Sequence, residues 1–304
     1  MQALLDAIAA APDLPTDACR LFHGRGGRFP GCEHLALDAF PPVLLLTSFK
    51  PLDEAALAAV GTALTTRFGD ALSWVYQCRG EGAETRLMAG AVPDPHVVTE
   101  AGTRYLVHLM RGQNHGLFLD MAAGRRWVRE HVTQGAKVLN LFAYSCAFSV
   151  VALQAGAAEV VNVDMASGAL STGRTNHELN GVKAGAKFLA HDIFNSWGKL
   201  TRGGPYDLVI CDPPSFQKGS FVATKDYARL AKRLPALLAP GGHALLCLNA
   251  PDAVEDSLRQ VVAEQAPELT CLGPVANPRV FEDVSPHRSL KVLAYRHRSE
   301  EHTS

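Results

Sequence analysis

Three aspartates stand at the ends of apolar runs that predict buried strands. Asp164 ends EVVNVD, Asp192 ends AKFLAHD and Asp212 ends YDLVICD. In a parallel sheet the ligand crevice lies beyond the carboxyl ends of the strands, so we expect these acids to point into one crevice. The alternative is that each aspartate only caps the helix that follows it. Three acids in succession favour the ligand site.

Each acid suits a particular hydrogen-bonding task. Asp164 is placed to accept from two ribose hydroxyls, and Asp192 is placed to accept from an adenine amino group. Asp212 precedes Pro213 and Pro214, which cannot donate to a sheet ladder and which stiffen the loop leaving the strand. Such a loop suits the holding of a substrate, because Asp212 and the Pro213 carbonyl can accept from its N–H groups.

The loop after the first predicted strand, FAYSCAFS (142–149), contains no glycine. A dinucleotide site needs G-x-G-x-x-G so that the backbone can approach a pyrophosphate, and no Walker sequence G-x-x-x-x-G-K-[ST] is present either. A ligand with a ribose and an adenine but without phosphates is therefore favoured. S-adenosylmethionine meets that description.

The elements that must position these residues alternate along the chain. Apolar β-type runs separated by helical patterns predict an α/β fold, a Rossmann-like and mostly parallel sheet, with strands at 137–143, 159–165, 186–192, 206–212 and 243–249. Runs at 268–275 and 289–296 lie close together and predict an antiparallel last strand. We assign this domain to residues 106–304. Residues 1–105 predict a small α+β domain, with a role in positioning RNA or another substrate as a hypothesis. Its glycine-rich turns lie at Gly24, Gly26, Gly27 and Gly31.

Composition narrows the class of protein. Of the 304 residues, 47% are hydrophobic and 19% are charged, which is typical of a soluble globular protein. The net charge of −1 argues against a strongly basic nucleic-acid binder but leaves a local basic face open. The seven cysteines form no C-x-x-C pair, and no apolar run approaches the ~20 residues of a membrane span. We expect a cytoplasmic protein with no metal and no membrane partner.

Several linked motifs carry a resemblance to a known family. NLFAYSCAFS (140–149), VVNVDMA (160–166), HDIF (191–194), YDLVICDPPSF (206–216) and LLAPGGHALLCLN (237–249) resemble the class I S-adenosylmethionine-dependent methyltransferases. They are most similar to the bacterial group that methylates 23S ribosomal RNA at cytosine C5 or guanine N7. GLFLD (116–120) also resembles this group, and residues 20–40 resemble its small β-rich domain.

The resemblance implies S-adenosylmethionine as cofactor, S-adenosylhomocysteine as product and RNA as partner. It implies that the cofactor is bound by Phe118, Asn140, Phe142, Ala143, Tyr144, Ser145, Asp164, Met165, Asp192, Ile193 and Asp212. It implies a catalytic set of Asp212, Pro213, Pro214, Phe216 and Asn249. Cys146 and Ala147 depart from the family, because relatives usually have glycine there.

A second departure bears on the methylated atom. Members that act on cytosine C5 carry a nucleophilic cysteine after the fifth strand, and that position is Asn249 here. Cytosine C5 needs a thiolate to add to C6, whereas guanine N7 has a lone pair and needs only positioning. Members with an Asn-Asn pair at this position resemble the guanine-N7 type, and this chain, with Leu248-Asn249, sides with them. Cys247 lies two residues earlier and is either a displaced nucleophile or, as we favour, a small buried strand residue.

Basic side chains gather in a few places, and we expect some of them to bind RNA phosphates. The candidates are Lys225, Arg229, Lys232, Arg125, Arg126 and Arg288. Phe216 is a candidate for stacking on an unpaired base, with packing against its own loop as the alternative.

Three functions remain open from sequence. An RNA methyltransferase is favoured. A methyltransferase of a small molecule or a protein, and a non-catalytic S-adenosylmethionine-binding protein, are the alternatives.

Overall fold

The computed structural model describes residues 1–214, 216–217, 221–250 and 255–298. The chain divides into two compact units, each described separately below. The N-terminal unit contains Met1–Asp120 and the later segment Pro278–Pro286, and the C-terminal unit contains Met121–Asn277 and His287–Ser304. The division predicted at residues 105 and 106 stays a prediction. No helix within the described residues combines the length and the hydropathy that a bilayer span needs.

The C-terminal unit contains a seven-stranded sheet with the order β10-β9-β8-β11-β14-β16-β15. Its strands run through β8 Lys137–Leu141, β9 Glu159–Asp164, β10 Ala186–Ala190, β11 Tyr206–Cys211, β14 Leu238–Leu248, β15 Leu269–Pro274 and β16 Lys291–His297. Strands β8, β9, β10, β11 and β14 pair with one another in parallel. Strand β16 pairs antiparallel with both β14 and β15. The predicted mostly parallel sheet with an antiparallel last strand is confirmed.

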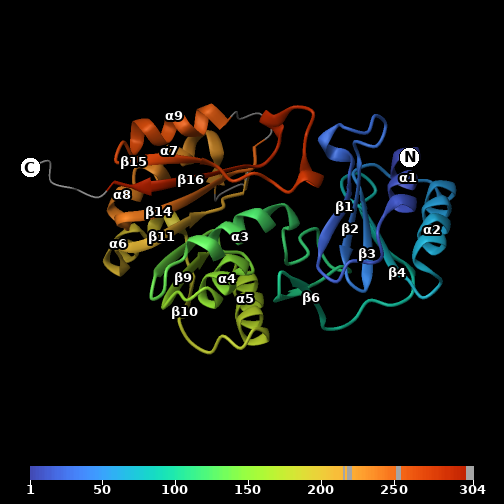
Figure 1. The fold of residues 1–304 in the computed structure, drawn as a ribbon, viewed down its shortest axis with the longest axis horizontal. Coiled ribbons are helices and arrows are strands. Elements are labelled where there is room, and N and C mark those ends of the chain that lie inside the picture. Colours follow the sequence, from blue (N-terminus) through green and yellow to red (C-terminus); the bar gives the residue numbers. More distant parts are fainter. Residues whose placement is uncertain (215, 218–220, 251–254, 299–304) are drawn as a thin grey trace, which may run out of the picture. The chain divides into compact units, whose positions relative to one another are not determined.

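Helices cover both faces of this sheet (Figure 1). They are α3 Ala122–His131, α4 Ala147–Gln154, α5 Ser167–Leu179, α6 Trp197–Gly203, α7 Ala223–Ala231, α8 Leu234–Leu237 and α9 Glu255–Gln265. Because side chains alternate along a strand, Leu139 and Leu141 pack in a cluster with α6 to α9, while Val138 packs with α3 and α4. The inner strands β8, β9 and β11 are therefore buried on both faces, as is typical of a parallel sheet, whereas the edge strand β10 is partly exposed.

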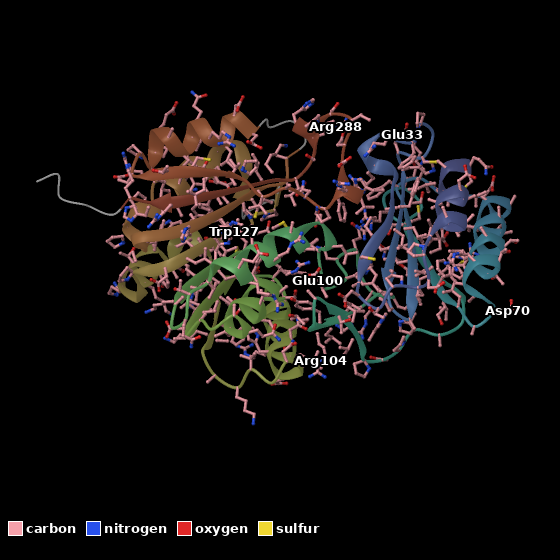
Figure 2. All side chains as sticks on the ribbon, viewed as in Figure 1. Glu33, Asp70, Glu100, Arg104, Trp127 and Arg288 are labelled. Carbon is pink, nitrogen blue, oxygen red and sulfur yellow. The ribbon has the colours of Figure 1, made fainter. Side chains whose placement is uncertain are left out.

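A five-stranded sheet, β1-β2-β3-β4-β5, forms the core of the N-terminal unit. The elements are α1 Gln2–Ala10, β1 Cys19–His23, β2 Leu35–Phe40, β3 Val43–Ser48, α2 Glu54–Phe68, β4 Ser73–Cys78 and β5 Glu84–Ala89. A separate hairpin joins β6 His96–Glu100 to β7 Thr103–Val107, and Figure 2 labels Glu100 and Arg104 on its two strands. Only β3 and β4 are parallel in the five-stranded sheet, because α2 connects them as a crossover.

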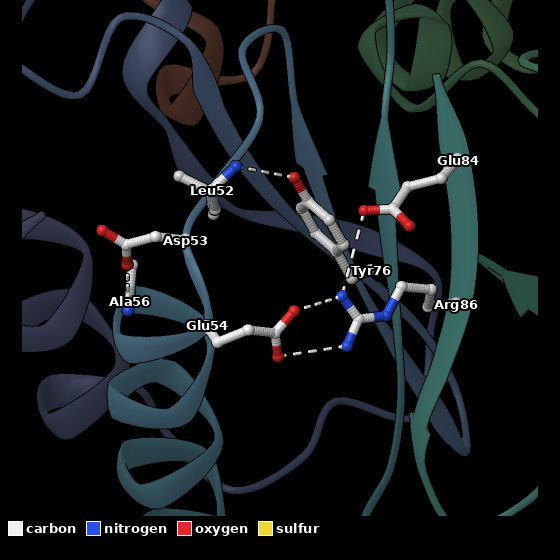
Figure 3. A network of polar contacts seen from close by, with 7 residues as sticks. All are labelled: Leu52, Asp53, Glu54, Ala56, Tyr76, Glu84 and Arg86. Atoms are coloured by element: carbon white, nitrogen blue, oxygen red, sulfur yellow. Dashed lines mark hydrogen bonds and ion pairs between the residues drawn. The ribbon is translucent and has the colours of Figure 1, made fainter. Parts of the chain in front are cut away.

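Polar contacts fix the start of α2 against the sheet (Figure 3). Asp53 caps the helix by accepting from the Ala56 backbone N–H at 2.7 Å. Arg86 on β5 donates to both carboxylate oxygens of Glu54, at 2.7 and 3.3 Å. The backbone N–H of Leu52 donates to the Tyr76 hydroxyl on β4 at 3.0 Å. These contacts tie the crossover helix to two strands of its own sheet.

Candidate cofactor and substrate site

The order of the strands in the C-terminal unit reverses at β8. This strand pairs in parallel with β9 on one side and with β11 on the other. The chain runs outward from β8 to β9 and β10, and then continues on the other side with β11 and β14. Parallel sheets bind ligands outside the carboxyl ends of the strands at such a switch point. The loops after β8, β9, β10 and β11 therefore form the candidate site.

The loop that leaves β8 has an unusual backbone. Phe142, Tyr144 and Cys146 have φ angles of 58°, 46° and 60°, in the left-handed region that favours glycine. For residues with a side chain this conformation costs on the order of 1–2 kcal/mol each. Such strain persists only where surrounding contacts hold it, and it gathers at functional sites. The loop thus adopts backbone conformations that favour glycine although it contains no glycine.

Asp164, at the end of β9, holds the strained loop. One carboxylate oxygen accepts from the backbone N–H of Tyr144 at 2.8 Å, and the other accepts from the backbone N–H of Ala166 at 2.8 Å. The backbone N–H of Ala143 also donates to the Val163 carbonyl at 3.1 Å. Each carboxylate oxygen can accept a second hydrogen bond. Asp164, which is half-buried, therefore keeps the capacity to accept from two ribose hydroxyls.

Helix α5 supports the same loop from behind. Asn176 donates from Nδ2 to the carbonyl of Ser145 at 2.9 Å. A Cβ at Gly173 would lie 2.5 Å from Cys146 Sγ, so this glycine allows the helix to approach the thiol closely. Burial raises the pKa of the Cys146 thiol, and the Asp164 carboxylate adds to the effect. Cys146 therefore packs as a neutral side chain.

Asn140 belongs to a buried polar chain that crosses the sheet and reaches α5. Its Nδ2 donates to Asn162 Oδ1 at 2.9 Å, and Asn162 donates to Ser149 Oγ at 3.0 Å. Ser149 lies 2.9 Å from Nε2 of His177, whose Nδ1 donates to the Gly173 carbonyl at 2.6 Å. Burial lowers the pKa of His177, so the ring is neutral and accepts from Ser149. These hydrogen bonds connect α4, α5, β8 and β9 to one another beneath the candidate site.

Asp192 and Asp212 end the next two strands in different settings. Asp192 caps a short 3₁₀ turn, Ile193–Asn195, by accepting from the Phe194 backbone N–H at 2.8 Å and from Asn195 Nδ2 at 2.6 Å. This geometry is compatible both with Asp192 as a cap and with Asp192 as a ligand for the cofactor, because a carboxylate can accept more than two hydrogen bonds. Asp212 is half-buried directly after β11, before the buried Pro213 and half-buried Pro214.

At the end of β14, one cysteine is buried and one asparagine is exposed. Cys247 is 0% exposed, and its carbonyl accepts from the Tyr227 hydroxyl on α7 at 2.8 Å. Asn249 is exposed just beyond the strand. The buried Lys291 of β16 donates from Nζ to the Ala250 carbonyl at 2.8 Å, which anchors the segment that carries Asn249.

One predicted basic residue is brought directly beside this site. Arg229 on α7 stacks over the ring of Phe194 at 4.3 Å and pairs with Asp226 at 2.7 Å. Phe194 follows the Asp192 cap, and Trp197 at the start of α6 lies edge-on to it at 5.9 Å. Neither aromatic residue was among the predicted site residues, although Phe194 and Trp197 lie only two and five residues beyond the strand-end Asp192.

The remaining predicted residues lie as follows. Met165 is 49% exposed after β9, Ile193 is buried, and Phe118 is 44% exposed in the N-terminal unit. Lys225, Lys232, Arg126 and Arg288 are exposed, the last in the 3₁₀ turn Pro286–Arg288 (Figure 2). Arg125 on α3 is only 3% exposed, so the structure does not place it on the surface where an RNA contact was expected. Phe216 lies in β12, Phe216–Gln217, but its side chain is outside the described part of the structure.

The donor and acceptor set at the strand ends fits S-adenosylmethionine. Acceptors for hydroxyl and amino groups come from the acids after β9, β10 and β11, and apolar surface comes from Phe142 and Met165. No glycine-rich phosphate loop accompanies them. A nucleoside cofactor without phosphates therefore suits the residues present.

Comparison with known proteins agrees with this chemistry. The family model described as S-adenosylmethionine-dependent methyltransferase matches residues 19–296. A ribosomal RNA large subunit methyltransferase I from Aeromonas salmonicida is 31% identical over 78% of this chain and 62% of that protein. A protein of the same name from Erwinia tasmaniensis is 32% identical over 87% of this chain and 68% of that protein. The chain thus spans about two thirds of the length of these relatives.

A solved structure supports the fold. A candidate SAM-dependent methyltransferase from Streptococcus mutans superposes with a TM-score of 0.84 at 24% identity, over 97% of this chain and 81% of that chain. Strand order, strand-end acids and a family model that spans both units lead to one assignment. The chain belongs to the S-adenosylmethionine-dependent methyltransferase family, and its cofactor is S-adenosylmethionine.

Proposed function

We propose that this chain methylates a base of large-subunit ribosomal RNA, by a guanine-N7 type of reaction rather than a cytosine-C5 type. The RNA substrate is supported by relatives that are named ribosomal RNA large subunit methyltransferase I. The type of reaction rests on one observation in this chain. The thiol nearest the end of β14, Cys247, is fully buried, while the exposed position beyond the strand is Asn249.

A cytosine-C5 reaction requires an accessible thiolate. Cys146 and Cys211 are also fully buried, and burial raises the pKa of both thiols. Cys271 lies on the edge strand β15, where Arg259 donates to its sulfur at 2.8 Å. None of these four cysteines is an exposed nucleophile at the end of β14.

Methylation at N7 needs less from the protein. The bound cofactor supplies a methyl group that is already activated as a sulfonium. The protein has to orient the base and accept from its N–H groups, and Asp212 and the Pro213 carbonyl are our candidates for that task. The guanine ring gains positive charge as it is methylated, and a carboxylate at Asp212 would stabilise that charge. We propose Asn249 as a second polar contact to the base edge.

The RNA-facing side of the site is proposed to include α7. Arg229 is ordered by its stack on Phe194, and Lys225 and Lys232 are exposed on the same helix or just after it. Arg126 and Arg288 are further exposed candidates, whereas the buried Arg125 is left out of this proposed face. Phosphate contacts of this type position RNA without reading its sequence.

The test offers the full chain and methyl-labelled S-adenosylmethionine to three pools, namely deproteinised large-subunit RNA, protein and small metabolites. We expect label in RNA, and digestion to nucleosides to give 7-methylguanosine. Label that enters only protein or metabolites contradicts the RNA substrate. 5-Methylcytidine contradicts the type of reaction.

A variant sharpens the second point. Cys247→Ser should keep methyl transfer, with a stability loss of about 1–2 kcal/mol for a buried hydroxyl. Cys271→Ser serves as the matched control, because it makes the same change on the edge strand. RNA that contains 5-fluorocytosine traps enzymes that add a thiolate to C6. A trapped adduct with the wild type, together with lost activity in Cys247→Ser alone, would make this a cytosine-C5 enzyme.

A further inference from the structure

A cluster of three arginines in the N-terminal unit has no role in the site described above. We define the arginine cluster as Arg20, Arg25 and Arg79. Arg25 stacks over the ring of Phe49 at 4.0 Å, and the Arg79 guanidinium lies 5.9 Å from the same ring. Arg20 stacks over Phe281 at 4.8 Å. Stacking on aromatic faces orders guanidinium groups and leaves their edges in a defined direction.

The turn that carries Arg25 is tightly fixed. It is a 3₁₀ turn, Gly24–Gly26, directly after β1. A Cβ at Gly24 would collide with the Cys32 carbonyl oxygen, and a Cβ at Gly26 would collide with the Glu282 carbonyl oxygen. The backbone N–H of Val284 also donates to the Gly26 carbonyl at 2.9 Å. Glycine on both sides of Arg25 thus lets the turn press against two other backbone segments, which holds the base of this side chain in place.

The carboxylate of Asp38, which lies within the cluster, already forms an ion pair with Arg20. Asp38 is buried and accepts from Nε and Nη2 of Arg20, the latter at 3.1 Å. Arg20 also donates from Nη1 to His23 Nδ1 at 2.6 Å. The nearby Arg28 pairs with Glu282, and Asp283 lies close enough to His23 to act on its pKa. The Asp38 carboxylate is therefore already paired with Arg20 through both of its oxygens.

Arg79 shows the excess of positive charge most clearly. It is half-buried, and its described hydrogen bonds go to Gln77 Oε1 at 2.8 Å and to His115 Nε2 at 3.1 Å. Both partners are uncharged, since burial lowers the pKa of His115. Burial lowers the pKa of Arg79 as well, and the charges of Arg20 and Arg25 add to this against Asp38. A partly desolvated cation with uncharged partners calls for an anion.

We propose that the arginine cluster binds a phosphodiester group of an RNA backbone, a site that rests on the proposed RNA substrate. The planar fork of a guanidinium matches the oxygens of a phosphate and binds them through two parallel hydrogen bonds. The guanidinium groups of Arg25 and Arg79, which share the ring of Phe49, form a site for one phosphate beside the positive charge of Arg20. The site positions the RNA strand and does not read its bases.

The experiment measures binding of a fluorescein-labelled single-stranded RNA of mixed sequence to the full chain across a series of salt concentrations. Arg25→Gln and Arg79→Gln are compared with Arg86→Gln, which removes the same charge from the same unit at the Glu54 pair shown in Figure 3. Loss of one phosphate contact lowers the slope of log K against log salt by about 0.7. We expect that reduction and an affinity loss of about tenfold for Arg25→Gln and Arg79→Gln.

Arg86→Gln should leave the slope and the affinity unchanged. Arg25 is exposed, so its variant tests the site even if Arg79→Gln fails to fold. Equal slopes and affinities for Arg25→Gln, Arg86→Gln and the wild type would overturn the site. Inorganic phosphate is titrated in parallel at constant ionic strength. Loss of phosphate binding in Arg25→Gln with unchanged RNA affinity would also overturn it, in favour of a free-anion site.

The same samples separate this inference from the proposed function. Methyl transfer to RNA by the wild type, with an unchanged salt slope in Arg25→Gln, overturns the arginine cluster alone. RNA binding that depends on Arg25 without any methyl transfer to RNA supports the cluster and contradicts the proposed substrate. Calorimetric binding of S-adenosylmethionine should be equal in all three variants, because none of these arginines lies in the C-terminal unit.

Discussion

Replacement of Asp164 by alanine is the sharpest test of the candidate cofactor site. The side chain has two tasks in our proposal, since it holds the backbone of Tyr144 and Ala166 and it accepts from the ribose hydroxyls of the cofactor. Asp164→Ala removes both tasks. Asp164→Asn keeps one carbonyl oxygen and turns the other acceptor into a donor, which would face a backbone N–H.

The expected magnitudes follow from the contacts. Each hydrogen bond to a charged group contributes about 1.5–3 kcal/mol, and the half-buried setting places these two at the lower end. We expect Asp164→Ala to lower the free energy of unfolding by about 2–3 kcal/mol. Loss of even one bond to a ribose hydroxyl weakens S-adenosylmethionine by about tenfold, so tenfold is the minimum. The strained residues Phe142 and Tyr144 would relax once released, which weakens binding further.

The assay combines calorimetric titration of S-adenosylmethionine with chemical denaturation of the full chain. Asp17→Ala is the matched control, because Asp17 also holds two groups, the Thr99 hydroxyl at 2.8 Å and the Ala101 backbone N–H at 2.9 Å. Asp17→Ala should lose stability and keep cofactor affinity, while Asp164→Asn should lie between Asp164→Ala and the wild type. Unchanged affinity in a folded Asp164→Ala protein would refute the reasoning.

Three further results are expected. Gly173→Ala should destabilise the protein by about 1–3 kcal/mol through its clash with Cys146 Sγ, and Cys146→Gly should restore stability in the double variant; independent effects in denaturation would contradict that contact. Burial and the charge of Arg20 lower the pKa of His23 to about 4, below its unfolded value, so the contribution of this ring to stability is present above about pH 6.5 and is lost as the pH falls toward 4. Allowing for solvent screening, the wild type should lose about 1–2 kcal/mol more than His23→Gln across that window, and parallel pH profiles would count against it. Asp212→Ala should lower turnover far more than cofactor affinity, and near-normal methyl transfer would reduce the Asp-Pro-Pro turn to a structural role.

The strands and their acids were within reach of the sequence because they depend on local chemistry. Apolar runs ending in Asp164, Asp192 and Asp212 predicted β9, β10 and β11 to within two residues. The antiparallel pairing of β15 and β16 followed from the short connection between them. Helix α7 ends at Ala231 and α8 begins at Leu234, with Pro235 in the first turn of α8, where a missing backbone N–H is tolerated.

Other features depend on contacts between distant residues and gave no local signal. Nothing in FAYSC shows that three of its residues adopt left-handed backbone, because Asp164 and Asn176 impose that conformation from later in the chain. Asn140 was assigned to the cofactor from its motif, and its described hydrogen bond runs to Asn162, its partner across the strand pair. Arg125 was expected on an RNA-facing surface, and its burial depends on tertiary packing that the neighbouring residues do not reveal.

The late return of the chain has a consequence for synthesis on the ribosome. Residues Pro278–Pro286 complete the N-terminal unit, and β16 then enters between β14 and β15. Until that strand emerges, β14 exposes an unpaired and strongly apolar edge through Leu245 and Leu246. Neither unit can therefore finish folding before the final segment has been translated, and a nascent chain that stalls earlier presents an aggregation-prone edge that a chaperone would have to cover.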